Sequence, residues 1–181
     1  SEATIRRDLS QLAQMGKLKK IYGGAASLET GYQTREIRVE ERQELYVEEK
    51  KQIAKYAASL IEPGDFVYVD AGSSTEYLVE YIEERDASYV TNSMSHALKL
   101  AGRGMKVSIL GGNVKGTTEA VVGADAMETL RRYHFTRGFW GADGIRKKEG
   151  CTTPEMEEAA VKRLSMKLDM AFFFCGSAKI I

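Results

Sequence analysis

The sequence of 181 residues carries 26 lysine and arginine residues against 26 aspartate and glutamate residues, so its formal net charge is zero. This length allows one packed domain of about 150 residues with a small appendage, and the balanced charge gives no indication of a nucleic-acid partner. No apolar run approaches the roughly 20 residues that a membrane-spanning helix needs, and the start lacks the pattern of a secretory leader.

Cysteine and histidine are scarce. Cys151 and Cys175 lie in unrelated contexts, and neither His96 nor His134 has a partner at the spacing of metal ligands. These counts exclude a disulfide framework and argue against a zinc site, and they fit a reducing compartment. We therefore expect a cytoplasmic protein without a metal or cofactor, in which both histidines are structural or surface residues.

The first elements of the chain are a predicted helix over 1–15, which ends at Gly16, and a short basic strand over 17–24. Positive charge gathers here, because residues 1–28 contain only two acidic residues, Glu2 and Asp8, against Arg6, Arg7, Lys17, Lys19 and Lys20. The chain opens without a methionine and stops just past an expected strand. We therefore expect that both ends of a longer protein are missing.

Residues 26–43 show little periodicity and many charges, which is typical of a linker. An amphipathic helix is predicted over 44–61, and Pro63 and Gly64 end it. Strands and helices then alternate, with strands expected over 66–69, 88–91, 106–110, 137–141 and 170–175 and helices over 75–84, 93–101, 124–132 and 154–167. This alternation predicts an α/β fold, a mostly parallel sheet flanked by helices.

The segment Asp70-Ala71-Gly72-Ser73-Ser74-Thr75 links the first of these strands to its helix. Gly72 permits a close backbone approach, three hydroxyl groups follow it, and the helix directs free N–H groups and its positive dipole end to the same place. These features predict a cradle for an anion, with phosphate as the expected ligand. The alternative is that the hydroxyl residues only cap the helix, as such residues often do.

The other strand ends help to decide between these alternatives, because ligands of parallel sheets bind outside the carboxyl ends of the strands. Polar or glycine residues follow all five strands: Asp70 to Thr75, Thr91-Asn92-Ser93, Gly111-Gly112-Asn113, Gly141-Ala142-Asp143-Gly144 and Gly176-Ser177-Ala178-Lys179. Five such ends together favour a polar pocket that tolerates phosphate.

These segments also carry a resemblance to a known family. Ser1 to Leu9, Gly16-Lys17-Leu18 and Tyr22-Gly23-Gly24-Ala25 resemble the recognition helix and wing of the DeoR family of bacterial transcription regulators. Several further segments resemble the sensor domain of that family: Asp70 to Thr75, Thr91-Asn92-Ser93, Leu110-Gly111-Gly112, Gly141 to Ile145, and Thr152-Thr153-Pro154 with Glu157 to Lys162.

The resemblance implies a partial winged helix-turn-helix unit over 1–25, a linker over 26–43 and an effector-binding sensor over 44–181. It further implies a sensor similar in fold to ribose-5-phosphate isomerase, truncated at its C-terminus, that binds a phosphorylated sugar or a related metabolite. We expect the linker and the helix over 44–61 to transmit the state of the pocket to the DNA-binding unit.

The first hypothesis is therefore a DNA-binding regulator, a repressor of sugar metabolism, that forms a homo-oligomer on a double-stranded operator. Arg6 and Arg7 would lie at the major groove, Thr4 at base edges or a phosphate, and Lys19 and Lys20 at backbone phosphates. The alternative for the arginines is an ordinary solvated helix face. The expected effector-binding residues are Asp70, Gly72, Ser73, Ser74, Thr75, Thr91, Asn92, Ser93, Gly111, Gly112, Asp143, Gly144, Glu157 and Lys179.

Among these, Lys179 would supply a positive charge to the phosphate, while Asp70, Asn92 and Asp143 would contact sugar hydroxyls. Glu157 either reaches the pocket or is an exposed carboxylate that stabilises its helix dipole. The family usually carries an acidic residue in the turn after the last strand, where this chain has Gly176. That departure leaves open a sensor with an altered effector, or one that binds nothing and serves only for assembly.

The second hypothesis is an enzyme, a sugar-phosphate isomerase that uses Asp143, Lys148 and Glu157 for proton transfer. By the similarity to ribose-5-phosphate isomerase, Lys148 and Glu157 keep a spacing seen between functional residues of that enzyme. However, the enzyme's Asp-x-x-Asp pattern becomes Asp143-Gly144-Ile145-Arg146 here, so the second carboxylate is absent. An isomerase would also have no use for the basic N-terminus, and we therefore expect no catalysis.

Overall fold

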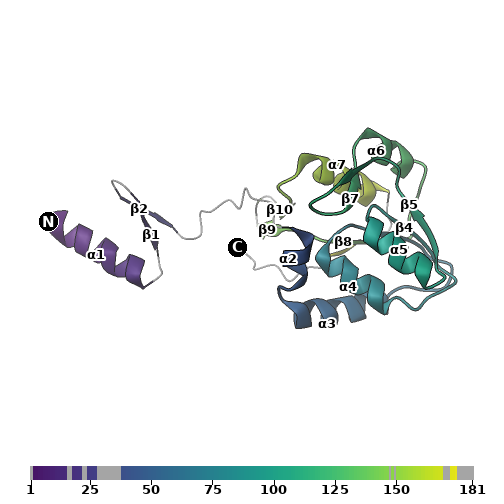
Figure 1. Ribbon diagram of the computed structural model, residues 1–181, viewed down its shortest axis with the longest axis horizontal. Helices are drawn as coiled ribbons and strands as arrows, with labels where there is room; N and C mark the ends of the chain where they lie inside the picture. The colour runs from purple at the N-terminus through teal and green to yellow at the C-terminus, as the bar shows by residue number, and fades with distance from the viewer. Residues whose placement is uncertain are drawn as a thin grey trace. The chain divides into compact units, whose positions relative to one another are not determined.

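The computed structural model describes residues 2–15, 18–21, 24–27, 38–146, 148, 150–168 and 172–174. The chain divides into two compact units, residues 1–35 and 36–181, and each is described by itself. Figure 1 labels the helices and strands of both units.

The N-terminal unit consists of one helix and a two-stranded hairpin. Helix α1 spans Glu2–Gln14, and strand β1 (Leu18–Ile21) pairs in antiparallel fashion with β2 (Gly24–Ser27). The predicted helix is thus confirmed over its described residues, and the basic strand is the first arm of a hairpin. Gly16 and Lys17, where the helix was expected to end, lie outside the described residues.

The C-terminal unit is built on a parallel five-stranded sheet with the strand order β11-β8-β3-β4-β5. Its strands are β3 (Phe66–Val69), β4 (Ser88–Thr91), β5 (Lys106–Ile109), β8 (Arg137–Trp140) and β11 (Phe172–Phe174). The predicted strands over 66–69 and 88–91 match in both bounds. The predicted α/β fold with a parallel sheet is therefore confirmed.

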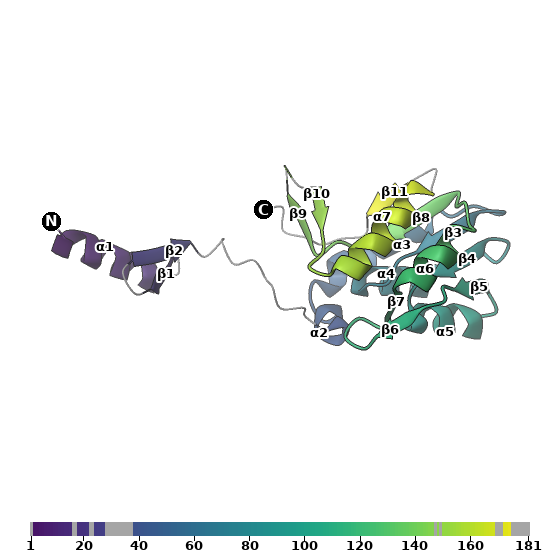
Figure 2. The same ribbon diagram turned by 90° about the horizontal axis from the view of Figure 1, so that it is seen from above.

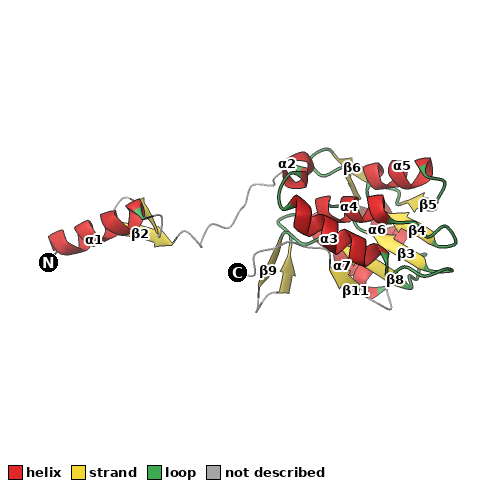
Figure 3. Ribbon diagram, turned by 90° about the horizontal axis from the view of Figure 1, so that it is seen from below, coloured by secondary structure: helices red, strands yellow, loops and turns green. Residues whose placement is uncertain are grey.

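Helices cover both faces of this sheet. Successive residues of each strand point to opposite faces, so neighbouring residues of one strand belong to different apolar clusters. Val67 and Val69 belong to one buried cluster with Leu78 of α4 and Leu100 of α5, whereas Tyr68 belongs to a second cluster. The first face carries α3 (Val47–Ala58), α4 (Ser73–Tyr81) and α5 (Met94–Gly102), and the second carries α6 (Ala124–Leu130) and α7 (Met156–Lys167) (Figures 1 and 3).

Two antiparallel hairpins interrupt the alternation of strands and helices, and the sequence analysis did not predict them. Strands β6 (Asn113–Lys115) and β7 (Ala120–Val122) form the first hairpin, and β9 (Gly144–Arg146) and β10 (Gly150–Thr152) form the second (Figure 2). Each of these strands has three residues, too few for a periodic pattern to distinguish them from loops.

The helix predicted over 44–61 is confirmed as α3, which has the narrower bounds Val47–Ala58, and a separate short helix precedes it. The structure has helix α2 (Val39–Gln43), a turn, and then α3, and Tyr46 in this turn adopts a left-handed backbone conformation with φ 55°. The ammonium group of the buried Lys50 donates to the carbonyl of Arg42, so the end of α2 is satisfied by a side chain instead of a further helical turn. Residues 39–43 of the expected linker are thus helical, while the exact domain bounds stay a prediction.

In the part of the chain that the structure describes, no helix combines the length and apolar character that crossing a bilayer would require.

Candidate effector site

The carboxyl ends of β3, β4 and β8 bring the first predicted site residues together. Asp70 directly follows β3, and its N–H donates to the carbonyl of Phe139 in β8 at 2.9 Å. The N–H of Ala71 donates to Oδ1 of Asn92, which follows β4, at 2.8 Å. The loop over 70–72 is therefore tied to both neighbouring strands, and it opens helix α4 at the edge where ligands of parallel sheets bind.

The start of α4 has the main-chain geometry expected of an anion cradle. Helix α4 begins at Ser73, and the first helical hydrogen bond runs from the N–H of Glu76 to the carbonyl of Gly72 at 2.9 Å. Among the described residues, the N–H groups of Ser73, Ser74 and Thr75 have no hydrogen-bond acceptor. Three donors and the positive end of the helix dipole thus face the same place.

The hydroxyl groups of this segment divide into two roles. Thr75 is fully buried, and its Oγ1 donates to the carbonyls of Asp70 at 2.6 Å and Gly72 at 2.9 Å, so its hydroxyl shapes the loop. Ser73 and Ser74 are buried as well, with 8% and 9% of their surface exposed, and among the described residues their hydroxyls make no such bond to the loop carbonyls. Only these two hydroxyls remain candidates for a ligand.

A histidine that the sequence analysis placed among structural residues supports this loop from α5. His96 is 1% exposed and is hydrogen-bonded to the backbone of Gly72. The pKa of His96 is lowered to about 3, chiefly by burial and further by the charge of Lys99, while the hydrogen bond to Gly72 opposes both. His96 is therefore a neutral imidazole at physiological pH, and its structural assignment agrees with its position.

Asp70 forms an ion pair that the sequence analysis missed. Its side chain is 1% exposed, and its Oδ2 accepts from the ammonium group of Lys162 in α7 and from the N–H of Gly141 at 3.4 Å. Its Oδ1 is buried and has no hydrogen-bond partner among the described residues. Burial raises the pKa of the Asp70 carboxyl, and the charge of Lys162 opposes this shift.

Helix α7 directs a different glutamate to the interior than the one singled out in the sequence. Glu157 is exposed, whereas Glu158 is 7% exposed and its Oε1 accepts from Oγ1 of Thr118 at 2.7 Å. Lys115 lies 3.4 Å from the same oxygen. Glu158 and Lys162 are four residues apart and therefore share one face of the helix, a spacing that was visible in the sequence.

The remaining predicted residues have structural partners of their own. Thr91 Oγ1 accepts from the N–H of Ser93, and Ser93 Oγ accepts from the N–H of His96 at 3.3 Å, which caps α5. Gly112 approaches Val122 so closely that an added Cβ would lie 2.6 Å from its carbonyl oxygen. An added Cβ would lie 3.4 Å from Oγ1 of Thr129 at Gly111 and 3.0 Å from Oγ1 of Thr152 at Gly144, which is less crowded than at Gly112. Lys179 lies outside the described residues.

Asp143, which lies in the segment after β8, is paired with helix α2. Its Oδ1 accepts from the guanidinium group of Arg42 in α2, and the two side chains are 31% and 22% exposed. Lys148, the second group of the isomerase hypothesis, is exposed. The structure therefore shows no contact that joins Asp143, Lys148 and Glu157, within the residues it describes.

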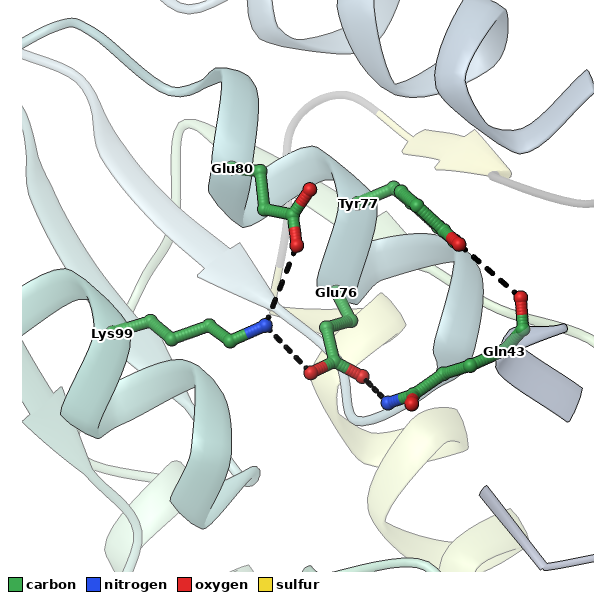
Figure 4. A pocket seen from close by; sticks show the side chains of 5 residues that line it. All are labelled: Gln43, Glu76, Tyr77, Glu80 and Lys99. Carbon is green, nitrogen blue, oxygen red and sulfur yellow. Dashed lines mark hydrogen bonds and ion pairs between the residues drawn. The ribbon is translucent and has the colours of Figure 1, made fainter. Parts of the chain in front are cut away.

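A small cavity lies beside the start of α4, between α2, α4 and α5. Figure 4 shows its five lining residues, with Lys99 2.7 Å from one carboxylate oxygen of Glu76 and Gln43 bonded to the other. Its volume of about 110 Å³ is well below the roughly 300–1,000 Å³ of small-molecule sites. The polar groups of this cavity satisfy one another, so we do not place the effector there.

The N-terminal unit carries the residues expected to contact DNA. Thr4 and Arg7 are exposed on α1. Arg6 lies on the same helix, and Lys19 and Lys20 lie on β1, but their side chains fall outside the described part of the chain. No three His, Cys, Asp or Glu side chains come together as metal ligands in the portion that the structure describes.

Solved structures show a similar fold. The chain aligns with ribose 5-phosphate isomerase from Plasmodium falciparum with a TM-score of 0.51 and 14% identity, over 70% of this chain and 49% of that chain. Ribose 5-phosphate isomerase A from Methanocaldococcus jannaschii gives a TM-score of 0.52 and 12% identity, over 71% of this chain and 51% of that one. At these identities the likeness concerns the fold alone.

Curated relatives are considerably closer in sequence. An uncharacterized HTH-type transcriptional regulator, FruR of Bacillus subtilis, is 37% identical over 92% of this chain and 66% of its own length. A lactose phosphotransferase system repressor of Staphylococcus epidermidis is 32% identical over 99% of this chain and 72% of its own length. The chain thus spans about two thirds to three quarters of these relatives.

Sequence models of the family cover both units of the chain. The DeoR-like helix-turn-helix domain matches residues 1–31, and the DeoR C-terminal sensor domain matches residues 46–173. The chain therefore belongs to the DeoR family of transcriptional regulators.

Proposed function

We propose that the chain is part of a DNA-binding repressor of sugar metabolism whose sensor unit binds a phosphorylated sugar. The observation that carries the sensor half of this proposal is the start of α4, where three N–H groups have no acceptor among the described residues. Relatives named as a transcriptional regulator and as lactose phosphotransferase system repressors support the regulatory half.

Phosphate suits the start of α4 for electrostatic reasons. A helix N-terminus offers N–H donors and a partial positive charge, and both favour an anion. Ser73 and Ser74 add hydroxyl donors to these N–H groups. Lys179, from beyond the described residues, is proposed as the cation at the phosphate.

The DNA half of the proposal rests on α1 and the β1–β2 hairpin, which lie within the matched helix-turn-helix domain and which we propose as its recognition helix and wing. Exposed Arg7, with Arg6 beside it in the sequence, would enter the major groove, while Lys19 and Lys20 would hold phosphates of the backbone. Such proteins bind paired half-sites as dimers, so we expect a homo-oligomer, measurable by analytical ultracentrifugation. A regulator of this kind acts in the cytoplasm.

An isomerase is the weaker alternative. Proton transfer would need a free carboxylate base beside the substrate, but Asp143 is paired with Arg42, and Glu157 faces solvent. The pattern Asp143-Gly144-Ile145-Arg146 also has a cation where the resemblance to the isomerases would require a second carboxylate. We therefore expect no turnover of any sugar phosphate that binds.

A thermal-shift screen of the full chain tests the sensor. Hexose phosphates, pentose phosphates and glycerol phosphate would be compared with their unphosphorylated counterparts. A hundredfold excess over the dissociation constant adds about 2.7 kcal/mol of stability, which raises the unfolding temperature by roughly 5–10 °C. Equal shifts with bare sugars, or no shift with any phosphate, would contradict the proposal, and turnover in a parallel isomerase assay would favour the enzyme.

A Ser74→Asp variant locates the phosphate. The new carboxylate would repel a phosphate at this helix start, so the variant should lose the ligand-induced shift in unfolding temperature. Retention of the full shift would place the phosphate elsewhere. Lys179→Ala should likewise abolish discrimination between phosphorylated and bare sugar.

A further inference from the structure

Asp70, Asn92 and Asp143 were expected to contact sugar hydroxyls, and they differ in whether their Oδ1 atoms already have a hydrogen-bond partner. Oδ1 of Asn92 accepts from the N–H of Ala71 at 2.8 Å, and Oδ1 of Asp143 accepts from Arg42. Oδ1 of Asp70, by contrast, is buried and has no partner in the described part of the chain. A buried acceptor that lacks a donor is costly, and a hydrogen-bond donor on a ligand would relieve this cost.

The position of Asp70 ties this oxygen to the proposed phosphate cradle. The carbonyl of Asp70 accepts from Thr75 Oγ1 at 2.6 Å, and the loop from Asp70 leads directly into the free N–H groups at the start of α4. A phosphate cannot contact the carboxylate itself, because their like charges repel. A hydroxyl group can, since it donates to a carboxylate in a charge-assisted hydrogen bond.

Lys162 holds this carboxylate in place. Its ammonium group donates to Oδ2, and the N–H of Gly141 donates to the same oxygen at 3.4 Å. Oδ1 is therefore the carboxylate oxygen without a donor among the described residues. The side chain of Lys162 is 13% exposed, and the negative charge of Glu158 acts on Asp70 from the preceding turn of α7. Burial raises the pKa of Asp70, and the ammonium group of Lys162 counters this by favouring the ionised form, which only accepts hydrogen bonds.

We propose that Asp70 Oδ1 selects effectors that carry a hydroxyl group a few bonds from the phosphate, and that Lys162 is the positioning residue for this contact. The inference rests on the proposed function, because it assumes that the phosphate occupies the start of α4. It assigns to the site a phosphorylated polyol or sugar, and it predicts rejection of analogues that lack the one hydroxyl.

Calorimetric titration with deoxy analogues tests the contact. Each hexose or pentose phosphate that binds the full chain would be compared with the analogues in which one hydroxyl is replaced by hydrogen. One deoxy position should weaken binding by between about tenfold and a hundredfold, the range for a hydrogen bond to a charged group. If no single deoxy position costs tenfold in the natural sequence, the inference is wrong, whatever the variants do.

Two variants then assign the effect to the pair. The deoxy ratio is the dissociation constant of the most weakened deoxy analogue divided by that of its parent compound. Asp70→Asn and Lys162→Met should each reduce this ratio to less than about threefold, while the preference for phosphorylated over bare sugar persists. Lys162→Arg should restore the ratio in part, because it keeps the charge. Lys167→Met, at an exposed position on the same helix, is the matched control and should leave the ratio unchanged.

The outcomes separate the two proposals. If no phosphorylated compound binds the natural sequence, the proposed function fails. If phosphates bind but Lys162→Met leaves the deoxy ratio intact and only lowers the unfolding temperature, Lys162 is merely structural and the inference fails alone. A reduced ratio with an unchanged preference for phosphate supports both.

Discussion

The polar residues at the strand ends are buried at little cost because nearly all of them bind one another. Asn92 accepts from Ala71, Thr75 donates to Asp70, and His96 is bonded to Gly72. Side chains from β4, α4 and α5 therefore fix a loop that would otherwise be free to rearrange. A cradle held in this way needs little reorganisation when a ligand arrives, and this favours tight binding.

His96 makes the stability of the sensor depend on pH. Its pKa is about 3 in the folded protein and about 6.5 when unfolded, so below pH 6.5 only the unfolded chain takes up the proton. The contribution is complete above pH 6.5 and is lost as the pH falls toward 3. Between pH 6.5 and 5 the loss is about 2 kcal/mol.

Urea unfolding at pH 7.5 and pH 5.0 checks this prediction. His96→Gln should remove about 2 kcal/mol of the difference in unfolding free energy between the two pH values. The control is His134→Gln, because His134 is exposed. An identical pH dependence in the natural sequence and in His96→Gln would contradict the assignment of a buried neutral imidazole.

Replacement of Gly112 should also destabilise the sensor. Its φ is 139°, and an added Cβ would lie 2.6 Å from the carbonyl oxygen of Val122. Gly112→Ala should therefore destabilise the sensor by about 1–3 kcal/mol or more in urea unfolding. Gly116→Ala, where no atom lies within 4 Å of the added carbon, is the matched control. If both variants lost the same unfolding free energy, close packing at Gly112 would not explain the loss.

At the scale of elements, α2 is attached to the same parts of the sensor that form the candidate site. Gln43 binds Glu76, one turn into α4, and the hydroxyl of Tyr77 donates to the carbonyl of Gln43 at 3.2 Å (Figure 4). Arg42 binds Asp143, and the buried Val39 donates to the carbonyl of Thr117 at 3.2 Å. A ligand that shifts α4 or Asp143 would therefore act on α2.

Loss of the Arg42 pair should loosen α2. A partly exposed charge-assisted hydrogen bond contributes roughly 1 kcal/mol, so Arg42→Met should speed amide hydrogen exchange over 39–43 by about fivefold. The control is Arg131→Met, which removes an exposed pair with Glu128. Unchanged exchange in α2 would mean that Arg42 does not hold it.

Binding of an effector should also alter exchange in this region, because a ligand changes DNA affinity only through different affinities for two arrangements of the protein. The expected range is 26–61, which includes α2 and α3. If a saturating phosphorylated sugar leaves exchange over this range unchanged, the proposed route from sensor to DNA-binding unit is wrong.

At the scale of the whole molecule, the zero net charge conceals a division between the two units. The N-terminal unit, residues 1–35, carries six positive and three negative charges, and residues 36–181 carry 20 positive and 23 negative charges. Electrostatic attraction to a duplex is therefore concentrated in the N-terminal unit, and the negative remainder discourages contact between DNA and the sensor.

Salt dependence of binding to a random-sequence 30-bp duplex tests this division. Each phosphate contact contributes about 0.9 to the slope of log affinity against log salt concentration, so Lys20→Ala should reduce the slope by roughly one. Lys55→Ala, at an exposed position on the sensor, should leave the slope unchanged. Equal slopes for Lys20→Ala and the natural sequence would exclude Lys20 from the interface.

The parallel sheet and its polar strand ends were readable in the sequence because their signals are local. Strands such as Phe66–Val69 alternate between two apolar clusters, and this period of two is written in the residue order. The cap of α5 at Ser93 and the close turn at Gly112 also follow from residue type. The family motifs added the helix-turn-helix and sensor assignments, which no periodicity contains.

Only the tertiary structure decided which polar groups meet. Asp70 and Lys162 are 92 residues apart and pair because β3 and α7 meet at one end of the sheet. The rotation of α7 about its axis determines that Glu158 is buried and Glu157 exposed. The break before α3 depends on the hydrogen bond from Lys50 to the carbonyl of Arg42. A sequence determines local conformation through short-range sterics and periodicity. The partners of a buried charge, however, depend on the burial and desolvation that the completed fold imposes.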